Sequence, residues 1–185
     1  MKRGKYEDLV FITGNQHKAN YLAKWLGMPV PHRKVDQDEI QSLDLREVVE
    51  HKARQAYEIV KKPVLVEDVA LTFTAMGRLP GTLIKWFLEE MGNEKLCGLA
   101  KGLSHQQAIS EMEYAIYDGT EMHFFSGVVQ GRISGEPRGD SFGWNNIFIP
   151  DGHEQTYGEM TEEQFNICSH RAHAIAKLRA YLQKT

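Results

Sequence analysis

The first third of the chain alternates short apolar runs with longer segments in which apolar side chains recur three and four positions apart. Short runs of that kind are typical of strands, and the longer spacing is typical of amphipathic helices. The expected elements are a strand at residues 9–14, a helix at 15–27, a strand at 30–36, a helix at 43–60 and a strand at 61–68 that ends in two acids. This order indicates α/β organisation.

The pattern changes in the middle of the chain. Residues 82–92 and 94–100 have helical spacing, whereas residues 108–119 and 121–134 predict the two strands of a hairpin that turns at Asp118-Gly119. A last helix is expected at residues 167–184. We therefore expect a mixed sheet with helices packed on it and a second lobe built partly on the long hairpin.

Length and composition favour an ordinary globular enzyme or binding protein. A chain of 185 residues, 42% hydrophobic and 25% charged, suits a single domain over residues 1–185. The net charge of -3 gives no case for nucleic-acid binding. We see no membrane-spanning run and no signal peptide, and the two cysteines lie far apart, so a reduced, cytoplasmic protein is the expectation.

Residues 13–18, TGNQHK, mark a predicted strand-to-helix turn. Backbone N–H groups and the positive end of a helix attract anions there, and Lys18 adds a charge. The spacing of a Walker loop is absent. The competing interpretation is an ordinary turn in which Asn15 caps the helix.

Two acids come from separate segments of the chain. Asp68 stands beside Glu67 at the end of a predicted strand, and Glu39 lies in a polar segment between elements. Such a pair can hold Mg²⁺ together with substrate phosphate oxygens, and one acid can take a proton from water. Loop acids are more often simply solvated.

Three further stretches carry polar or aromatic groups that suit a flat, anionic ligand. Residues 141–152, SFGWNNIFIPDG, place large aromatic rings beside Asn145 and Asn146. This pattern predicts a structured loop that binds a flat ligand. SHR at 169–171 opens the last helix with a hydroxyl, an imidazole and a guanidinium, although Ser169 alone fits an N-cap. Lys85 follows the turn at Pro80-Gly81 and could equally be a surface residue.

The order of these motifs resembles the inosine triphosphate pyrophosphatase family over about residues 9–182. The motifs that carry the resemblance are TGNQHK, DEIQ, LVEDVALTF, LPGTLIKWF, PRGDSFGW, FIPDG, YGEM and NICSHRAHA. The resemblance implies Mg²⁺-dependent hydrolysis of ITP, dITP or XTP to the monophosphate and pyrophosphate. It also implies a homodimer and a long mixed, curved sheet flanked by helices, in two lobes with a central cleft.

The resemblance also gives each candidate residue a role. Glu39 and Asp68 would bind the metal, and Asp68 would be the catalytic base. The phosphate-binding residues would be Thr13, Gly14, Asn15, Lys18, Lys52 and Lys85, and the base-binding residues Phe142, Gly143, Trp144, Asn145, Phe165, His170 and Arg171.

Four positions depart from the family pattern. Asn145 stands where relatives have Asp, Phe165 where they have Lys, Val69 where they have Ser or Thr, and Tyr21 where they have Glu. Two alternatives to the ITP or XTP pyrophosphatase therefore stay open: the same chemistry on a different or modified nucleotide, and a nucleotide-binding protein that has lost hydrolysis. The retained acids and lysines argue against the second alternative.

Overall fold

The strands of this fold form one mixed sheet. Within residues 6–184, which the computed structural model describes, seven strands follow the order β2-β1-β3-β5-β6-β7, and β4 pairs with β3 off this path. β1 pairs in parallel with β2 and β3, whereas the β3–β4 and β6–β7 pairs are antiparallel. The predicted mixed sheet with flanking helices is confirmed.

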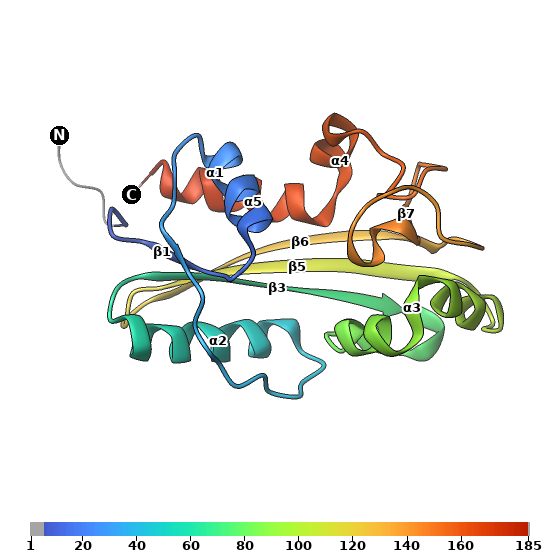
Figure 1. The fold of residues 1–185 in the computed structure, drawn as a ribbon, viewed down its shortest axis with the longest axis horizontal. Coiled ribbons are helices and arrows are strands. Elements are labelled where there is room, and N and C mark those ends of the chain that lie inside the picture. The colour runs from blue at the N-terminus through green and yellow to red at the C-terminus, as the bar shows by residue number, and fades with distance from the viewer. Residues whose placement is uncertain (1–5, 185) are drawn as a thin grey trace. The chain divides into compact units, whose positions relative to one another are not determined.

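The chain divides into two compact units (Figure 1). The first contains the residues up to Asp68, Glu113–Ser126 and the residues from Ala174 onward, and the second contains Val69–Met112 and Gly127–His173. Because three strands contribute to both units, the chain passes between them several times. The single domain expected over residues 1–185 stays a prediction.

The first unit is built on the parallel strands. Its elements are β1 (Val10–Ile12), α1 (Gln16–Leu26), β2 (His32–Arg33), α2 (Leu45–Val60), the first half of β3 (Val64–Phe73), the hairpin end of β5 (Gln107–Tyr117) and β6 (Met122–Ile133), and most of α5 (His170–Leu182). In this unit α2 covers one face of the strands, while α1 and α5 cover the other (Figure 1). Phe11, Leu22 and Leu65 are fully buried in its core.

Local signals account for the helix ends in this unit. The Asn15 side chain accepts hydrogen bonds from two N–H groups at the start of α1, and Asp44 does the same for α2. Gly27 ends α1 in the left-handed region at φ 70°, which glycine adopts without a steric penalty. The predicted cap at Asn15 and stop at Gly27 are confirmed.

The second unit is built on the remaining halves of β3, β5 and β6. It adds η1 (Thr74–Met76), β4 (Pro80–Gly81), α3 (Ile84–Lys101), η2 (Gly143–Asn146), β7 (Phe148–Pro150) and α4 (Glu162–Cys168). Gly92 has a non-helical conformation within α3, so the two helices predicted there are confirmed as two segments. The core of this unit includes Trp144, Phe148 and Tyr157.

The structure corrects several predicted boundaries. β3 does not end at the two acids but runs five residues further, because VALTF is itself a strand-forming sequence with buried positions. The second strand is only two residues long, and β4 stands where a sharp turn at Pro80-Gly81 was expected. The last helix is interrupted at Ser169, where the extended backbone separates α4 from α5 and leaves Ile167 exposed.

The predicted hairpin turn forms at Asp118-Gly119. The Asp118 carboxylate accepts hydrogen bonds from the N–H groups of Thr120 and Glu121, and Gly119 has φ 94°, so the predicted turn is confirmed. Across residues 6–184, every helix is too short or too polar to cross a membrane.

Candidate functional site

Glu67 and Asp68 are neighbours on β3, and their side chains lie on opposite faces of the sheet in the first unit. Successive side chains of a strand point to opposite faces. Glu67 accordingly pairs with Lys18 of α1, at 2.6 Å between Nζ and Oε1, and Asp68 pairs with Lys52 of α2, at 2.6 Å between Nζ and Oδ2. The sequence alone placed these acids together at a strand end, whereas the structure separates them.

Glu39, Lys52 and Asp68 form the first cluster of predicted site residues. The Lys52 ammonium lies 2.6 Å from Asp68 Oδ2 and 3.9 Å from Glu39 Oε1, so both carboxylates meet at one cation. The Lys52 and Asp68 side chains are 18% and 24% exposed, and Glu39 is half exposed. The cluster therefore remains open to solvent and to a ligand.

This arrangement suits a divalent cation. Mg²⁺ binds one or two carboxylates and completes its coordination with water and phosphate oxygens. Two carboxylates from separate segments already converge on a positive charge here, which fits such an ion. Within residues 6–184 no group of three or more His, Cys, Asp or Glu side chains is placed to hold a metal ion.

The turn before α1 is a capped helix start. Asn15 Oδ1 accepts from the N–H groups of His17 at 2.9 Å and Lys18 at 3.3 Å, and Thr13 Oγ1 accepts from Asn15 N–H at 3.0 Å. The cap occupies two N–H groups that an anion would otherwise use, so the capping interpretation is correct. Gly14 is exposed, and a Cβ there would lie 3.1 Å from the Lys34 side chain. Phosphate binding by this turn stays a prediction that depends mainly on Lys18.

An aromatic group forms the corresponding candidate site in the second unit. The His170 ring stacks on Trp144 at 5.0 Å between centroids and lies 5.6 Å from Tyr157. Phe165 meets Tyr157 edge-on at 5.1 Å. Trp144 is 7% exposed, so its ring is part of the core, while Phe142 is 65% exposed. The two rings expected to flank a base therefore have very different environments.

His170 and Arg171 are both buried, which the sequence did not distinguish from surface positions. α5 begins at His170, and the Ser169 hydroxyl accepts from Ala172 N–H at 3.1 Å, so Ser169 is a helix cap as expected. Burial, and then the positive charges of Arg171 and His173, hold the pKa of His170 well below its usual range. His170 is thus neutral, and its buried Nδ1 has no hydrogen-bond partner within residues 6–184.

Asn145 and Asn146 of the 141–152 segment make different hydrogen bonds. Asn146 accepts from Ser141 N–H and donates to the Ser141 carbonyl, both at 3.0 Å, so it closes the loop on itself. Asn145 is buried and donates to the Ser141 hydroxyl at 3.1 Å. Gly143, at φ 67°, has its carbonyl held by Asn93 of α3. At least one of the two amides is therefore structural.

Lys85 lies on α3, and its Nζ stands 5.1 Å from the centre of the Trp86 ring. Trp86 is 55% exposed. This cation–π contact accounts for part of the position of Lys85, and its role toward phosphate stays a prediction.

Comparison with known proteins now decides the family. The sequence model of the Ham1 family matches residues 9–181. The chain belongs to the Ham1 family. It is 41% identical to a Schizosaccharomyces pombe protein named inosine triphosphate pyrophosphatase, over 96% of both chains. It is 39% identical to a Yarrowia lipolytica protein of the same name, over 94% of this chain and 95% of the relative.

A solved Ham1 structure has the same fold. The Staphylococcus aureus Ham1 protein superposes with a TM-score of 0.84 at 24% identity, covering 95% of this chain and 98% of that one. The family resemblance read from the sequence motifs is thereby confirmed, and so is the fold class. The central cleft that the resemblance implied stays a prediction.

Sequence reasoning missed three contributors to the Ham1 candidate site. Glu67 is the buried partner of Lys18. Gln37 and Gln55 join the segment that carries Glu39 to α2. An acid before Asp68 was visible in the sequence, but its direction was not. Nothing in the sequence marks the two glutamines, because the groups that join them across the segment, the Lys52 carbonyl and the Asp38 N–H, belong to the backbone.

Proposed function

We propose that this chain is a pyrophosphatase that hydrolyses non-standard purine nucleoside triphosphates such as ITP, dITP and XTP to the monophosphate and pyrophosphate. The observation that carries the proposal is 41% identity, over 96% of both chains, to a relative named inosine triphosphate pyrophosphatase. The cluster of Glu39, Lys52 and Asp68 supports it, because this chemistry requires acids and a cation around a phosphate chain.

In this proposal Glu39 and Asp68 would hold Mg²⁺, which would neutralise charge on the phosphate oxygens. Lys52 supplies a second positive charge at the same place, and Lys18 and Lys85 bind further phosphate oxygens. The turn residues Thr13, Gly14 and Asn15 face the phosphate chain.

Asp68 acts as the base. A carboxylate can take a proton from water as that water attacks the α-phosphorus. The bond from the α-phosphorus to the bridging oxygen breaks, and pyrophosphate leaves with the electron pair. Lys52 orients the Asp68 carboxylate through the 2.6 Å ion pair.

The aromatic group of the second unit holds the base. Neutral His170 suits a 6-keto purine, because a neutral imidazole keeps one unprotonated nitrogen that can accept from the N1–H that hypoxanthine and xanthine carry and adenine lacks. Arg171 and Asn145 supply donors at the base edge, and Phe142, Gly143, Trp144 and Phe165 supply surface around it. Since Phe165 packs on Tyr157, it acts as an apolar wall.

The test is pyrophosphate release from ITP, XTP, dITP, ATP and GTP with Mg²⁺. We expect preference for the 6-keto, non-standard substrates. The Asp68→Asn variant should lose about a hundredfold or more in kcat while still binding a non-hydrolysable ITP analogue. Asp8→Asn, at an exposed turn, is the matched control. Wild type that releases no pyrophosphate from any of these nucleotides would overturn the proposal.

The homodimer that the resemblance implied and the cytoplasmic location expected from the composition remain part of this proposal, as does the absence of nucleic-acid and membrane partners. Sedimentation of the purified protein would test the dimer.

A further inference from the structure

The segment that carries Glu39 lies outside every helix and strand. Residues 34–42 have no regular secondary structure, and the Glu39 side chain is half exposed. A segment without ladder hydrogen bonds takes its position from other contacts. Whatever holds these residues therefore determines where the Glu39 carboxylate stands.

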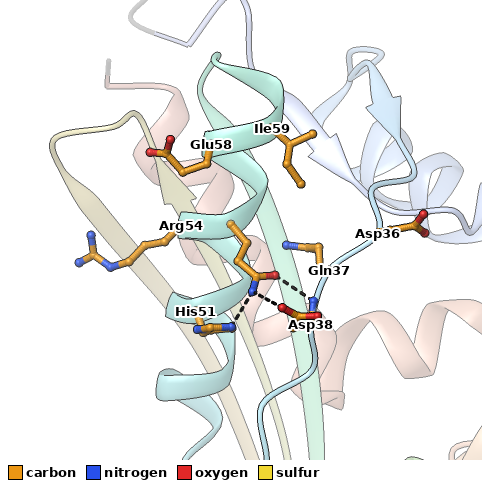
Figure 2. Close-up of a pocket in the computed structure, with 8 residues that line it drawn as sticks. Asp36, Gln37, Asp38, His51, Arg54, Glu58 and Ile59 are labelled. Carbon is orange, nitrogen blue, oxygen red and sulfur yellow. Dashed lines mark hydrogen bonds between the residues drawn. The ribbon is translucent and has the colours of Figure 1, made fainter.

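Two glutamine side chains join this segment to α2, one from the segment and one from the helix. Gln37 of the segment donates from Nε2 to the carbonyl of Lys52 at 2.5 Å. Gln55 of α2 accepts at Oε1 from the N–H of Asp38 at 3.0 Å (Figure 2). The ties engage the two residues directly before Glu39, and one of them ends on Lys52, whose ammonium faces Glu39.

The Gln55 amide has a fixed orientation. Because the Asp38 N–H can only donate, the amide oxygen must face it, and the amide nitrogen then faces His51 Nε2 at 2.8 Å and Asp38 Oδ2 at 3.5 Å. His51 thus accepts at Nε2 and carries its proton on Nδ1. With partners on both sides, Gln55 is oriented before any ligand arrives.

These side chains line an open cavity of about 540 Å³ beside α2. Its other lining residues are Asp36, Arg54, Glu58 and Ile59. The Gln55 amide contacts both His51 and Asp38, whereas Arg54 and Glu58 point away from the segment (Figure 2). Among the α2 residues that line this cavity, Gln55 is therefore one whose side chain binds the segment directly.

We propose that Gln55, assisted by Gln37, is a positioning residue that sets the Glu39 carboxylate against Lys52 and Asp68 for metal binding. The inference rests on the proposed function, in which Glu39 holds Mg²⁺. Partners that orient a metal-binding carboxylate typically change metal affinity or activity by about 10–100-fold when they are removed. The effect should fall on the metal rather than on the chemical step.

The experiment compares Gln55→Met and Gln55→Glu with wild type. Methionine has a similar length but makes no hydrogen bond. Glutamate still accepts from Asp38 N–H, but it cannot donate to the Asp38 carboxylate and places a like charge beside it. Glu58→Gln is the matched control, because Glu58 lies on the same helix, lines the same cavity and pairs with Lys61.

Two measurements separate positioning from folding. Binding of Mn²⁺ alone, without nucleotide, is followed by electron paramagnetic resonance, and pyrophosphate release is titrated with Mg²⁺. We expect both Gln55 variants to weaken Mn²⁺ binding, and to raise the Mg²⁺ concentration for half-maximal activity, by about tenfold. The kcat at saturating Mg²⁺ should stay near wild type, and the control should match wild type in both measurements.

Glu39→Gln, measured in parallel, distinguishes the two levels of the argument. If Glu39→Gln weakens Mn²⁺ binding and both Gln55 variants do not, the positioning inference is overturned and the proposed metal site stands. If Glu39→Gln binds Mn²⁺ as tightly as wild type, the metal assignment fails, and the role of Gln55 fails with it. A loss of kcat at saturating Mg²⁺ with unchanged Mn²⁺ affinity would likewise overturn the inference.

Discussion

Acidification should destabilise this protein through His170. The imidazole is buried, and burial together with the charges of Arg171 and His173 holds its pKa well below the usual range. In the unfolded chain the same group titrates at about 6.5. Below that pH the unfolded state binds a proton that the folded state does not, so stability is complete above about pH 6.5 and is lost as the pH falls further.

The size of the effect follows from the proton difference. A His170 that stays neutral in the folded protein over this range lowers the unfolding free energy by up to about 1.4 kcal/mol at about pH 5.5 relative to about pH 8. The slope then approaches about 1.4 kcal/mol per pH unit.

His170→Phe isolates this contribution. Phenylalanine keeps a ring against Trp144 and Tyr157, and it leaves no group without a partner, because His170 Nδ1 has no hydrogen-bond partner within residues 6–184. Other titrating groups act equally in both proteins and cancel in the difference.

The assay is urea unfolding followed by tryptophan fluorescence at about pH 8, 6.5 and 5.5. The gap between wild type and His170→Phe should change by about 1.4 kcal/mol over this range, in favour of the variant at low pH. Parallel curves would refute the reasoning, since they would mean that His170 is protonated as readily in the folded protein as in the unfolded chain.

Two further predictions concern packing. Gly131→Ala should lower the unfolding free energy by about 2–4 kcal/mol in urea titrations, because a Cβ there would lie 2.2 Å from the Ile149 carbonyl oxygen. Gly98→Ala is the control. A Cβ at Gly98 has no neighbour within 4 Å, so this variant should be neutral or stabilising. Asn146→Ala should lower kcat/KM for ITP about tenfold or more by releasing both hydrogen bonds to Ser141, and wild-type kinetics would show that the loop does not depend on them.

The sequence by itself determined the local features of this protein. The cap at Asn15, the stop at Gly27 and the hairpin turn at Asp118-Gly119 were predictable, because each depends on residues within a few positions of one another. The order of motifs along the chain also sufficed to recognise the family that the Ham1 match then confirmed.

Only the tertiary structure decided which candidate residues meet. The sequence ended β3 at its two acids, but the strand continues, and its pleat sends Glu67 to Lys18 and Asp68 to Lys52 on opposite faces. The burial of His170 likewise comes from packing against Trp144 and not from its neighbours in the chain.

The hydrogen bonds that hold the Glu39 segment against α2 could not be predicted from the sequence either. Gln55 and Asp38 are 17 positions apart, and Gln37 binds a backbone carbonyl 15 positions away. Every residue has a backbone carbonyl and every residue except proline has an N–H, so the sequence does not indicate which residue is the partner. Local rules depend on side-chain identity at short spacing, whereas these contacts exist only once the sheet and α2 have brought distant backbone together.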